Sequence, residues 1–168
     1  MVRKKTVLPK LNKIRMVIMD ADGVLTDGRI IFGSDGTDYR CFHAHDGYGI
    51  TRAIEKGLKL AIISGKGSNT VVLRSRRLGI TDIILNAMDK VKAFQKLKRK
   101  YKLEYDEVCF IGDDEFDLPL LLKVGFSAAP KDGIKVVREQ VDYVTEAKGG
   151  HGAVREVLDK IFHAQKLL

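Results

Sequence analysis

The sequence predicts an α/β fold: a Rossmann-like parallel sheet with helices on both faces. Short runs of valine, isoleucine and leucine alternate along the chain with longer amphipathic stretches. Several short runs end in glycine together with acidic or hydroxyl residues, which is typical of a strand that leads into a turn. Strands that alternate with helices form a parallel sheet covered on both faces. We expect residues 1–168 to form one domain of this kind.

Composition limits the classes of protein to which the chain can belong. Its 168 residues are 45% hydrophobic, as in a globular domain, and no run approaches the roughly 20 apolar residues of a membrane helix. Residues 1–15 are basic but lack the apolar segment of a signal peptide, so we expect a cytoplasmic protein without a membrane partner. The only cysteines, Cys41 and Cys109, form no Cys-x-x-Cys motif, which argues against disulfide, zinc or thiol chemistry.

The net charge of +8 raises the question of a nucleic-acid partner. Much of this charge lies in residues 3–15 and in the run 96–102. Neither segment has the interleaved aromatic residues that single-strand binding favours. We therefore expect a solvated basic surface and no nucleic-acid partner, although the same positive field attracts an anionic substrate.

The first predicted strand is the apolar run that ends at Met19. Two β-prone runs, residues 29–32 and 39–42, follow it and are separated by the turn-forming sequence Gly33-Ser34-Asp35-Gly36. We therefore expect a small β-hairpin insertion at about residues 28–42. It directly follows residues 20–25, so it is expected either to overhang the site after the first strand or to pack against another subunit. A two-stranded hairpin cannot bury its own apolar side chains, which indicates oligomerisation.

From residue 46 onward, helices and strands alternate regularly. Asp46 is a suitable N-cap, so we expect a helix that starts there and ends at Gly57. Further strands are predicted at residues 58–63, 82–85, 107–111, 126–128 and 142–145. Helices are predicted to begin at residue 68 or 69 and to cover residues 89–102, 115–124, 134–139 and 153–164. The sequence Gly-Gly-His-Gly at 149–152 is expected to be a flexible hinge within a C-terminal tail, residues 148–168.

Asp20 and Asp22 are the first candidate catalytic residues. They directly follow an apolar run, and residues i and i+2 of an extended chain point to the same side. Gly23 allows the chain to turn away after them. Two neighbouring carboxylates repel each other unless a cation compensates, and Mg²⁺ is bound by such oxygen ligands. A polar turn after a buried strand has the same local pattern, so the other strand ends decide between these interpretations.

Other predicted strands end in residues that complete a phosphate site. Ser64-Gly65 follows one strand, Gly112-Asp113-Asp114 follows another, and Lys90 comes after a third. The carboxyl ends of parallel strands meet at one edge of the sheet, where ligands bind. Carboxylates there would bind the cation, while a hydroxyl, backbone N–H groups and a lysine would bind phosphate oxygens. The combination predicts a site for a phosphate and a divalent metal.

These motifs resemble those of the haloacid dehalogenase superfamily of phosphatases. Asp20-Ala21-Asp22-Gly23-Val24 is similar to its first motif, Ser64 to the second, Lys90 to the third, and residues 112–117 to the fourth. Residues 20–28, the hairpin, residues 46–50 and residues 149–156 more specifically resemble the capless family of 3-deoxy-D-manno-octulosonate 8-phosphate phosphatases. The resemblance implies a haloacid dehalogenase fold without a large cap domain. It also implies a homotetramer with the hairpin and the C-terminal tail at subunit interfaces.

The resemblance assigns the chemistry to three acids. Asp20 would be the nucleophile that forms an aspartyl phosphate, and Asp22 would be the general acid and then the general base. The cofactor would be Mg²⁺, bound by the carboxylates of Asp20 and Asp113 and by the backbone carbonyl of Asp22.

The resemblance also implies the residues that bind the substrate. Ser64, the Gly65 amide and Lys90 would bind the phosphoryl group, and Asp117 would lie behind them and orient Lys90 or a metal-bound water. Lys66 stands where arginine is common in the family, and lysine lacks arginine's two-pronged donor geometry. The implied contacts to the rest of a small anionic sugar phosphate come from Asp22, His45, Asp46, Gly47, Lys66 and Arg74.

The implied reaction is Mg²⁺-dependent hydrolysis of 3-deoxy-D-manno-octulosonate 8-phosphate in lipopolysaccharide precursor biosynthesis. The motifs recognise phosphate and not the sugar, so another sugar phosphate, such as a sialic-acid-type 9-phosphate, stays open as the substrate. A second alternative is a receiver-like phosphoacceptor module, which also combines clustered acids, a hydroxyl and a lysine on a parallel sheet. The third is a catalytically inactive scaffold, although all four motifs are intact.

Overall fold

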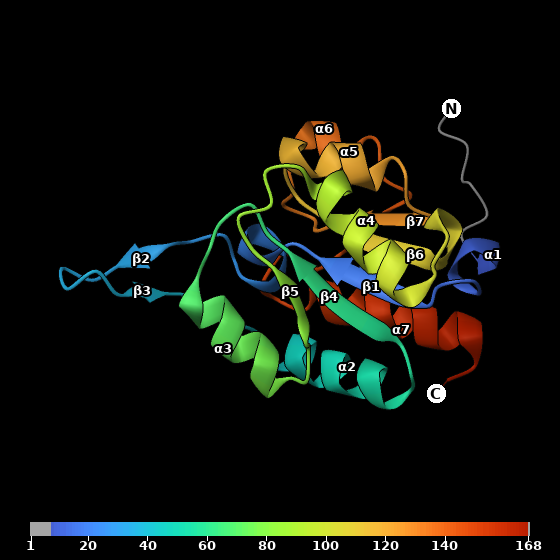
Figure 1. Cartoon of the computed structure of the whole chain (residues 1–168), viewed down its shortest axis with the longest axis horizontal. Coiled ribbons are helices and arrows are strands. Elements are labelled where there is room, and N and C mark those ends of the chain that lie inside the picture. Colours follow the sequence, from blue (N-terminus) through green and yellow to red (C-terminus); the bar gives the residue numbers. More distant parts are fainter. Residues whose placement is uncertain (1–7, 168) are drawn as a thin grey trace.

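A six-stranded parallel sheet forms the centre of the computed structural model, which describes residues 8–167 (Figure 1). Its strand order is β5-β4-β1-β6-β7-β8, and every neighbouring pair is parallel. Because β4 lies on one side of β1 and β6 on the other, the strand order reverses at β1, where such sheets bind ligands. The strands are β1 (Met16–Met19), β4 (Lys59–Ile63), β5 (Asp82–Ile84), β6 (Val108–Ile111), β7 (Phe126–Ala129) and β8 (Tyr143–Val144).

Helices cover both faces of the sheet because its central strands are apolar on both sides (Figure 1). In β1, Val17 and Met19 belong to one hydrophobic core, and Met16 and Ile18 belong to the other. The first core is covered by α1 (Leu8–Leu11), α2 (Ala44–Glu55), α3 (Asn69–Arg77) and α7 (Ala153–Gln165). The second is covered by α4 (Lys90–Tyr101), α5 (Leu118–Leu121) and α6 (Lys135–Arg138). The predicted fold class is confirmed.

The predicted hairpin is present between β1 and α2, with short strands β2 (Ile31–Phe32) and β3 (Asp38–Tyr39). It projects away from the sheet and its helices (Figure 1). Phe32 and Tyr39 are 73% and 57% exposed, so the described residues of this chain leave the aromatic side chains of the hairpin uncovered. Among the described residues between β1 and α2, this hairpin is the only inserted element, as expected of a fold without a large cap domain.

The helix predicted to start at Asp46 starts earlier, so that prediction is wrong. Helix α2 begins at Ala44, with His43 in the N-cap position. The Asp46 side chain, now in the first turn, turns to a different helix, where it accepts hydrogen bonds from the backbone N–H groups of Gly152 and Arg155. Asp46 therefore caps the start of α7. The local sequence does not indicate which of the two helices this side chain caps.

The segment 149–152 is packed tightly against this chain and is not the flexible hinge that was predicted. A Cβ on Gly149 would lie 1.8 Å from the carbonyl oxygen of Gly23, so only glycine fits there. The N–H of Gly150 donates to the carbonyl oxygen of Val24 at 3.0 Å. The following helix, α7, contributes buried residues to the first core. The start of the C-terminal tail therefore supports the loop that carries Asp22.

Two further differences concern helices. The predicted helix over 115–124 is a tight turn, Glu115–Asp117, followed by the short α5, because the Asp117 side chain folds back onto the N–H groups of Asp113 and Asp114. Helix α1 was not predicted. Among the described residues, no helix combines the length and apolar character needed to cross a bilayer.

The basic N-terminal segment is partly neutralised by the fold. Lys10, Lys13 and Arg15 form ion pairs with Asp142, Asp106 and Glu107, at 2.7 to 3.0 Å. The remaining basic residues of this segment, Arg3, Lys4 and Lys5, lie outside the described residues.

Candidate active site

A cavity of about 450 Å³ opens at the carboxyl ends of β1, β4 and β6. This is the edge of the sheet at which the sequence predicts a phosphate site. The cavity brings together residues from four separate predicted motifs. Those that line it are Asp20, Asp22, Ser64, Gly65, Lys66, Lys90, Asp113, Asp114 and Asp117.

Lys90 lies between two of the acids. Its Nζ is 3.0 Å from Oδ1 of Asp20 and 2.5 Å from Oδ1 of Asp117, and its side chain is 3% exposed. Asp117 is completely buried, and its other oxygen, Oδ2, accepts hydrogen bonds from the N–H groups of Asp113 and Asp114. Asp117 therefore fixes Lys90 beside Asp20 and also shapes the loop that presents Asp113.

Burial and mutual repulsion raise the pKa values of two of the acids. Burial, and then the charge of Asp117, raise the pKa of Asp20 to about 6 despite the opposing effect of Lys90. Burial, and then the charge of Asp20, raise the pKa of Asp113 to about 8. Burial alone would lower the pKa of Lys90, but Asp20 and Asp117 outweigh it and raise that pKa. The cluster thus has more negative charge than its one lysine neutralises.

The acid cluster fits a divalent cation. One carboxylate oxygen from each of Asp20, Asp113 and Asp117 lies within 4.8 Å of the other two. Oδ1 of Asp113 is buried without a hydrogen-bond donor among residues 8–167, and the buried Oδ1 of Asp20 has only its ion pair with Lys90 at 3.0 Å, whereas both oxygens of Asp117 accept hydrogen bonds. Buried acceptors without donors are the ligands that a hard cation such as Mg²⁺ requires. Asp20 and Asp113 are therefore the carboxylates with room to bind it.

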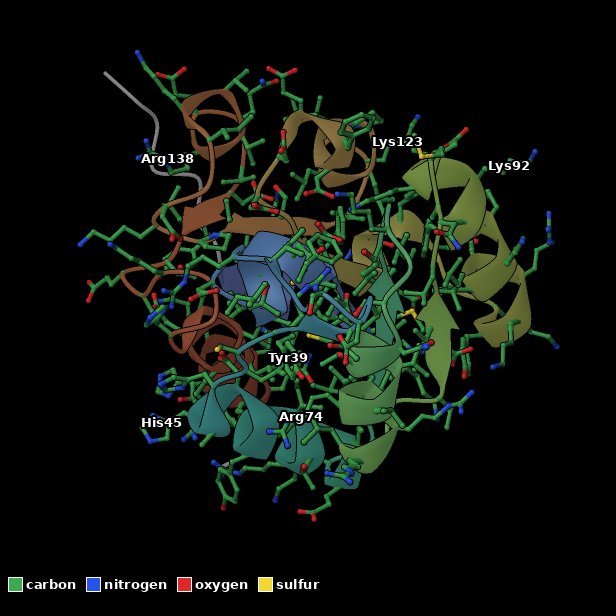
Figure 2. The ribbon with its side chains drawn as sticks, turned by 90° about the vertical axis from the view of Figure 1, so that its left-hand side faces the viewer. Tyr39, His45, Arg74, Lys92, Lys123 and Arg138 are labelled. Carbon is green, nitrogen blue, oxygen red and sulfur yellow. The ribbon has the colours of Figure 1, made fainter. Side chains whose placement is uncertain are left out.

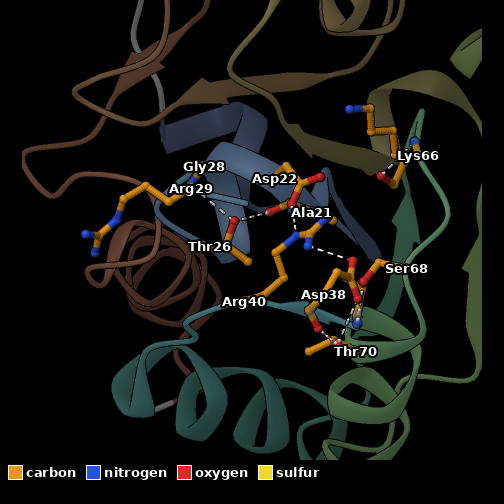
Figure 3. Close-up of polar contacts among 12 residues, drawn as sticks. Ala21, Asp22, Thr26, Gly28, Arg29, Asp38, Arg40, Lys66, Ser68 and Thr70 are labelled. Atoms are coloured by element: carbon orange, nitrogen blue, oxygen red, sulfur yellow. Dashed lines mark hydrogen bonds and ion pairs between the residues drawn. The ribbon is translucent and has the colours of Figure 1, made fainter. Parts of the chain in front are cut away.

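Gly23 is required by this arrangement. Its φ of +83° is in the left-handed region that favours glycine, and a Cβ at this position would lie 2.0 Å from Oδ2 of Asp113. The buried hydroxyl of Thr26 accepts hydrogen bonds from the N–H groups of Gly23 and Gly28 and closes the loop (Figure 3). The loop that carries Asp22 is thereby fixed close to Asp113.

Asp22 has a partner that the sequence did not reveal. Nε of Arg40, at the end of the hairpin, donates to Oδ1 of Asp22 at 2.8 Å, and its Nη1 donates to Oδ2 of Asp38 at 2.7 Å (Figure 3). The Arg40 side chain is 2% exposed. The hairpin therefore reaches back to one of the two acids of the first motif.

Comparison with known proteins agrees with this geometry. A family profile, haloacid dehalogenase-like hydrolase, matches residues 60–158. The 3-deoxy-D-manno-octulosonate 8-phosphate phosphatase KdsC of Escherichia coli K12 is 40% identical over 159 residues, which cover 95% of this chain and 85% of that protein. This chain belongs to the haloacid dehalogenase-like hydrolases.

Solved structures assign the chain more narrowly within these hydrolases. The 3-deoxy-D-manno-octulosonate 8-phosphate phosphatase of Yersinia pestis is 38% identical, with a TM-score of 0.94 over 95% of this chain and 86% of that one. The corresponding enzyme of Moraxella catarrhalis is 39% identical, with a TM-score of 0.93 over 95% and 92%, and its structure is a complex with a magnesium ion, a phosphate ion and a KDO molecule. The chain is an enzyme of this phosphatase family.

Some predicted residues of the hydrolase lie away from the cavity. His45 is exposed on α2, and Arg74 lies where α3 meets α2, with its guanidinium close to Gly47 (Figure 2). Asp46 is 2% exposed and caps α7, so its carboxylate lies away from this cavity, and its contact with substrate stays a prediction. The structure does not bring these four residues to the cavity of the same chain.

The cavity also has an apolar rim that sequence reasoning missed. Met88 and Phe116 line it and are 72% and 65% exposed, and Ile30 from the hairpin lines it as well. The only available signal was that Met88, between a predicted strand and a predicted helix, and Phe116, at the start of a predicted helix, are apolar residues close to Lys90 and Asp117. At Ser64, the hydroxyl is nearly buried and accepts a weak hydrogen bond from the Lys66 N–H at 3.4 Å.

Proposed function

We propose that this phosphatase hydrolyses 3-deoxy-D-manno-octulosonate 8-phosphate to the free sugar acid and inorganic phosphate, with Mg²⁺ as cofactor. The observation that carries the proposal is the buried cluster in which Lys90 pairs with Asp20, while Oδ1 of Asp113 has no donor among residues 8–167. The similarity to relatives of that name, one of them in complex with magnesium, phosphate and KDO, supports the substrate.

Asp20 is the nucleophile in this proposal. An oxygen of its carboxylate attacks phosphorus, the bond from phosphorus to the sugar oxygen breaks, and an aspartyl phosphate forms. Water then attacks phosphorus, and the carboxylate of Asp20 is regenerated. Lys90, paired with Asp20 at 3.0 Å, offsets the repulsion between the incoming phosphate and the carboxylate.

Asp22 moves the protons of both steps. In the first it donates a proton to the departing sugar oxygen, and in the second it accepts one from the attacking water. Its position on the loop after β1, lining the same cavity as Asp20, supports this role.

The remaining residues bind the phosphoryl group and the cofactor. Ser64, the amide of Gly65 and Lys90 hold the phosphoryl oxygens, and Asp117 keeps Lys90 in place. The carboxylates of Asp20 and Asp113 and the backbone carbonyl of Asp22 would hold Mg²⁺, which would supply positive charge to the phosphate. Lys66 lines the cavity and is the contact that we propose for the sugar acid.

We also propose a homotetramer in which the hairpin lies at subunit interfaces. Phe32 and Tyr39 support it, because a monomer would leave these aromatic side chains in water. The exposed His151, in the C-terminal tail, is a second candidate for contact with a neighbour.

A panel of phosphorylated sugar acids tests the proposed reaction. Purified protein with Mg²⁺ should release phosphate from 3-deoxy-D-manno-octulosonate 8-phosphate far faster than from a sialic-acid-type 9-phosphate, and a chelator should abolish release. Preference for the nine-carbon substrate would agree with the proposed reaction but contradict the proposed substrate. A single turnover followed by a stable phosphoprotein would indicate a phosphoacceptor module.

A further inference from the structure

Arg40 occupies an unusual place relative to the active site. It lies outside the cavity lining, yet its nearly buried guanidinium donates directly to Oδ1 of Asp22. An arginine that forks between two carboxylates holds both in a defined orientation, because its donors are fixed in one plane. Arg40 therefore holds one carboxylate oxygen of Asp22 from outside the cavity lining, and the other oxygen remains available to a ligand in the cavity.

The other branch of Arg40 is anchored to the body of the protein. Nη1 of Arg40 donates to Oδ2 of Asp38 at 2.7 Å. The hydroxyl of Thr70, in the first turn of α3, donates to the backbone oxygen of Asp38 at 3.0 Å and lies 3.3 Å from its Oδ1 (Figure 3). A chain of contacts thus runs from α3 through the hairpin to Asp22, and each member is held by the next.

We propose that Arg40 is a positioning residue for Asp22: it sets the orientation in which that carboxylate meets the oxygen of the leaving group. This role rests on the proposed function, in which Asp22 is the general acid. A proton donor must be aligned with the departing oxygen, and a small displacement of a reacting group lowers the rate steeply. Asp22 is partly exposed, at 23% of its side chain, and without Arg40 its carboxylate is free to rotate toward solvent.

Two kinds of substrate separate positioning from a structural role. An alkyl phosphate, such as a sugar phosphate, releases a strongly basic oxygen that must be protonated as it leaves. An activated aryl phosphate, such as 4-nitrophenyl phosphate, releases a stable phenolate and gains little from a general acid. The ratio kcat/KM reports the steps from substrate binding to departure of the leaving group. It therefore includes the step in which Asp22 donates a proton and excludes the later hydrolysis of the aspartyl phosphate.

The test compares Arg40→Met with wild type on both substrates. We expect kcat/KM to fall about 10- to 100-fold with the sugar phosphate and less than about 3-fold with the aryl phosphate, mainly through kcat. Arg40→Lys keeps a single donor and should recover part of the loss. Asp38→Ala and Thr70→Val keep Arg40 but remove its anchor, and should show the same substrate dependence to a smaller degree.

Arg29→Met is the matched control. Like Arg40, Arg29 lies in the hairpin segment, and it forms an ion pair with the nearby Asp27. Its side chain is 76% exposed, and neither Arg29 nor Asp27 lines the cavity. It should match wild type on both substrates.

Equal losses on both substrates in the folded Arg40→Met variant would overturn the positioning role, as would full activity on the sugar phosphate. If Arg40→Met does not fold, Asp38→Ala and Thr70→Val decide by the same ratio. A wild-type protein that hydrolyses no alkyl phosphate would instead refute the proposed function, a result visible before any variant is made.

Discussion

The carboxylate of Asp46, in α2, accepts a 2.8 Å hydrogen bond from the backbone N–H of Arg155, in the first turn of α7. Its second oxygen accepts from the N–H of Gly152 at 3.2 Å. The first N–H groups of a helix have no partner within the helix, so an acid that binds them stabilises its start. Here that acid comes from another helix and joins α2 to α7.

Replacing Asp46 with alanine should therefore affect stability. We expect Asp46→Ala to lower the free energy of unfolding by about 1–2 kcal/mol, in the range of a lost helix cap, with kcat/KM close to wild type. Urea denaturation measures it. Asp159→Ala is the control, because it removes only a partly exposed ion pair with Arg155 and should cost less than about 1 kcal/mol. An unchanged stability together with a raised KM would mean that Asp46 contacts the substrate.

Asp46 also illustrates what the sequence can and cannot predict. Asp20, Ser64, Lys90 and Asp113 were found because each follows a strand or stands at a helix start, and parallel strands bring such positions together. An acid before a helical pattern looks the same whether it caps that helix or another one. The partner of Asp46 lies 109 residues away, so its role depends on tertiary packing that no local pattern encodes.

Arg40 was missed for the same physical reason. Its role depends on the path by which the hairpin returns to the loop after β1, and no spacing rule links position 40 to position 22. The segment 149–152 was misjudged because glycines indicate either flexibility or close backbone contact. Gly149 indicates close backbone contact, because a Cβ at this position would lie 1.8 Å from the carbonyl oxygen of Gly23.

Lys90 should be required for the fold as well as for catalysis. Its removal leaves Asp117, which is completely buried, without a cation. We expect Lys90→Met to lower the free energy of unfolding by about 3–5 kcal/mol and to abolish phosphate release. Lys92→Met, on the exposed side of the same helix, should unfold at the wild-type urea concentration. Equal urea midpoints for the two variants would contradict this account.

The two raised pKa values predict how stability depends on pH. The carboxyls of Asp20 and Asp113, with pKa values of about 6 and about 8, hold protons in the folded metal-free protein that they release at an ordinary pKa of 3.8 when unfolded. Their contribution to stability is complete below about pH 4 and is lost as pH rises through these values. Mg²⁺ binds the deprotonated acids, so its binding should tighten as pH rises and release protons.

Thermal unfolding with and without Mg²⁺ checks this relation. The increase in Tm produced by Mg²⁺ should be small at about pH 5 and large at about pH 9. Asp113→Asn should remove most of the difference. An increase of the same size at both pH values would be inconsistent with binding at these two acids.

The exposed aromatic residues of the hairpin predict that the protein is an oligomer. Light scattering should find wild type as a tetramer and the double variant Phe32→Ser, Tyr39→Ser as a smaller species with unchanged helix content, because neither residue belongs to a hydrophobic core. Leu122→Ser, which replaces a side chain that is 59% exposed in the turn after α5, should remain a tetramer. A monomeric wild type would remove the hairpin from the proposed interface.

The central claim is that Asp20 carries the phosphoryl group. Asp20→Asn should keep the fold, because it removes a buried charge, and should lower phosphate release at least about 1,000-fold. The most direct measurement is acid quenching of the wild-type enzyme during turnover, followed by mass spectrometry of its peptides. We predict a phosphoryl group on the peptide that contains Asp20 and none in Asp20→Asn. Steady phosphate release with no phosphorylated peptide, or with the group on another residue, would contradict the account.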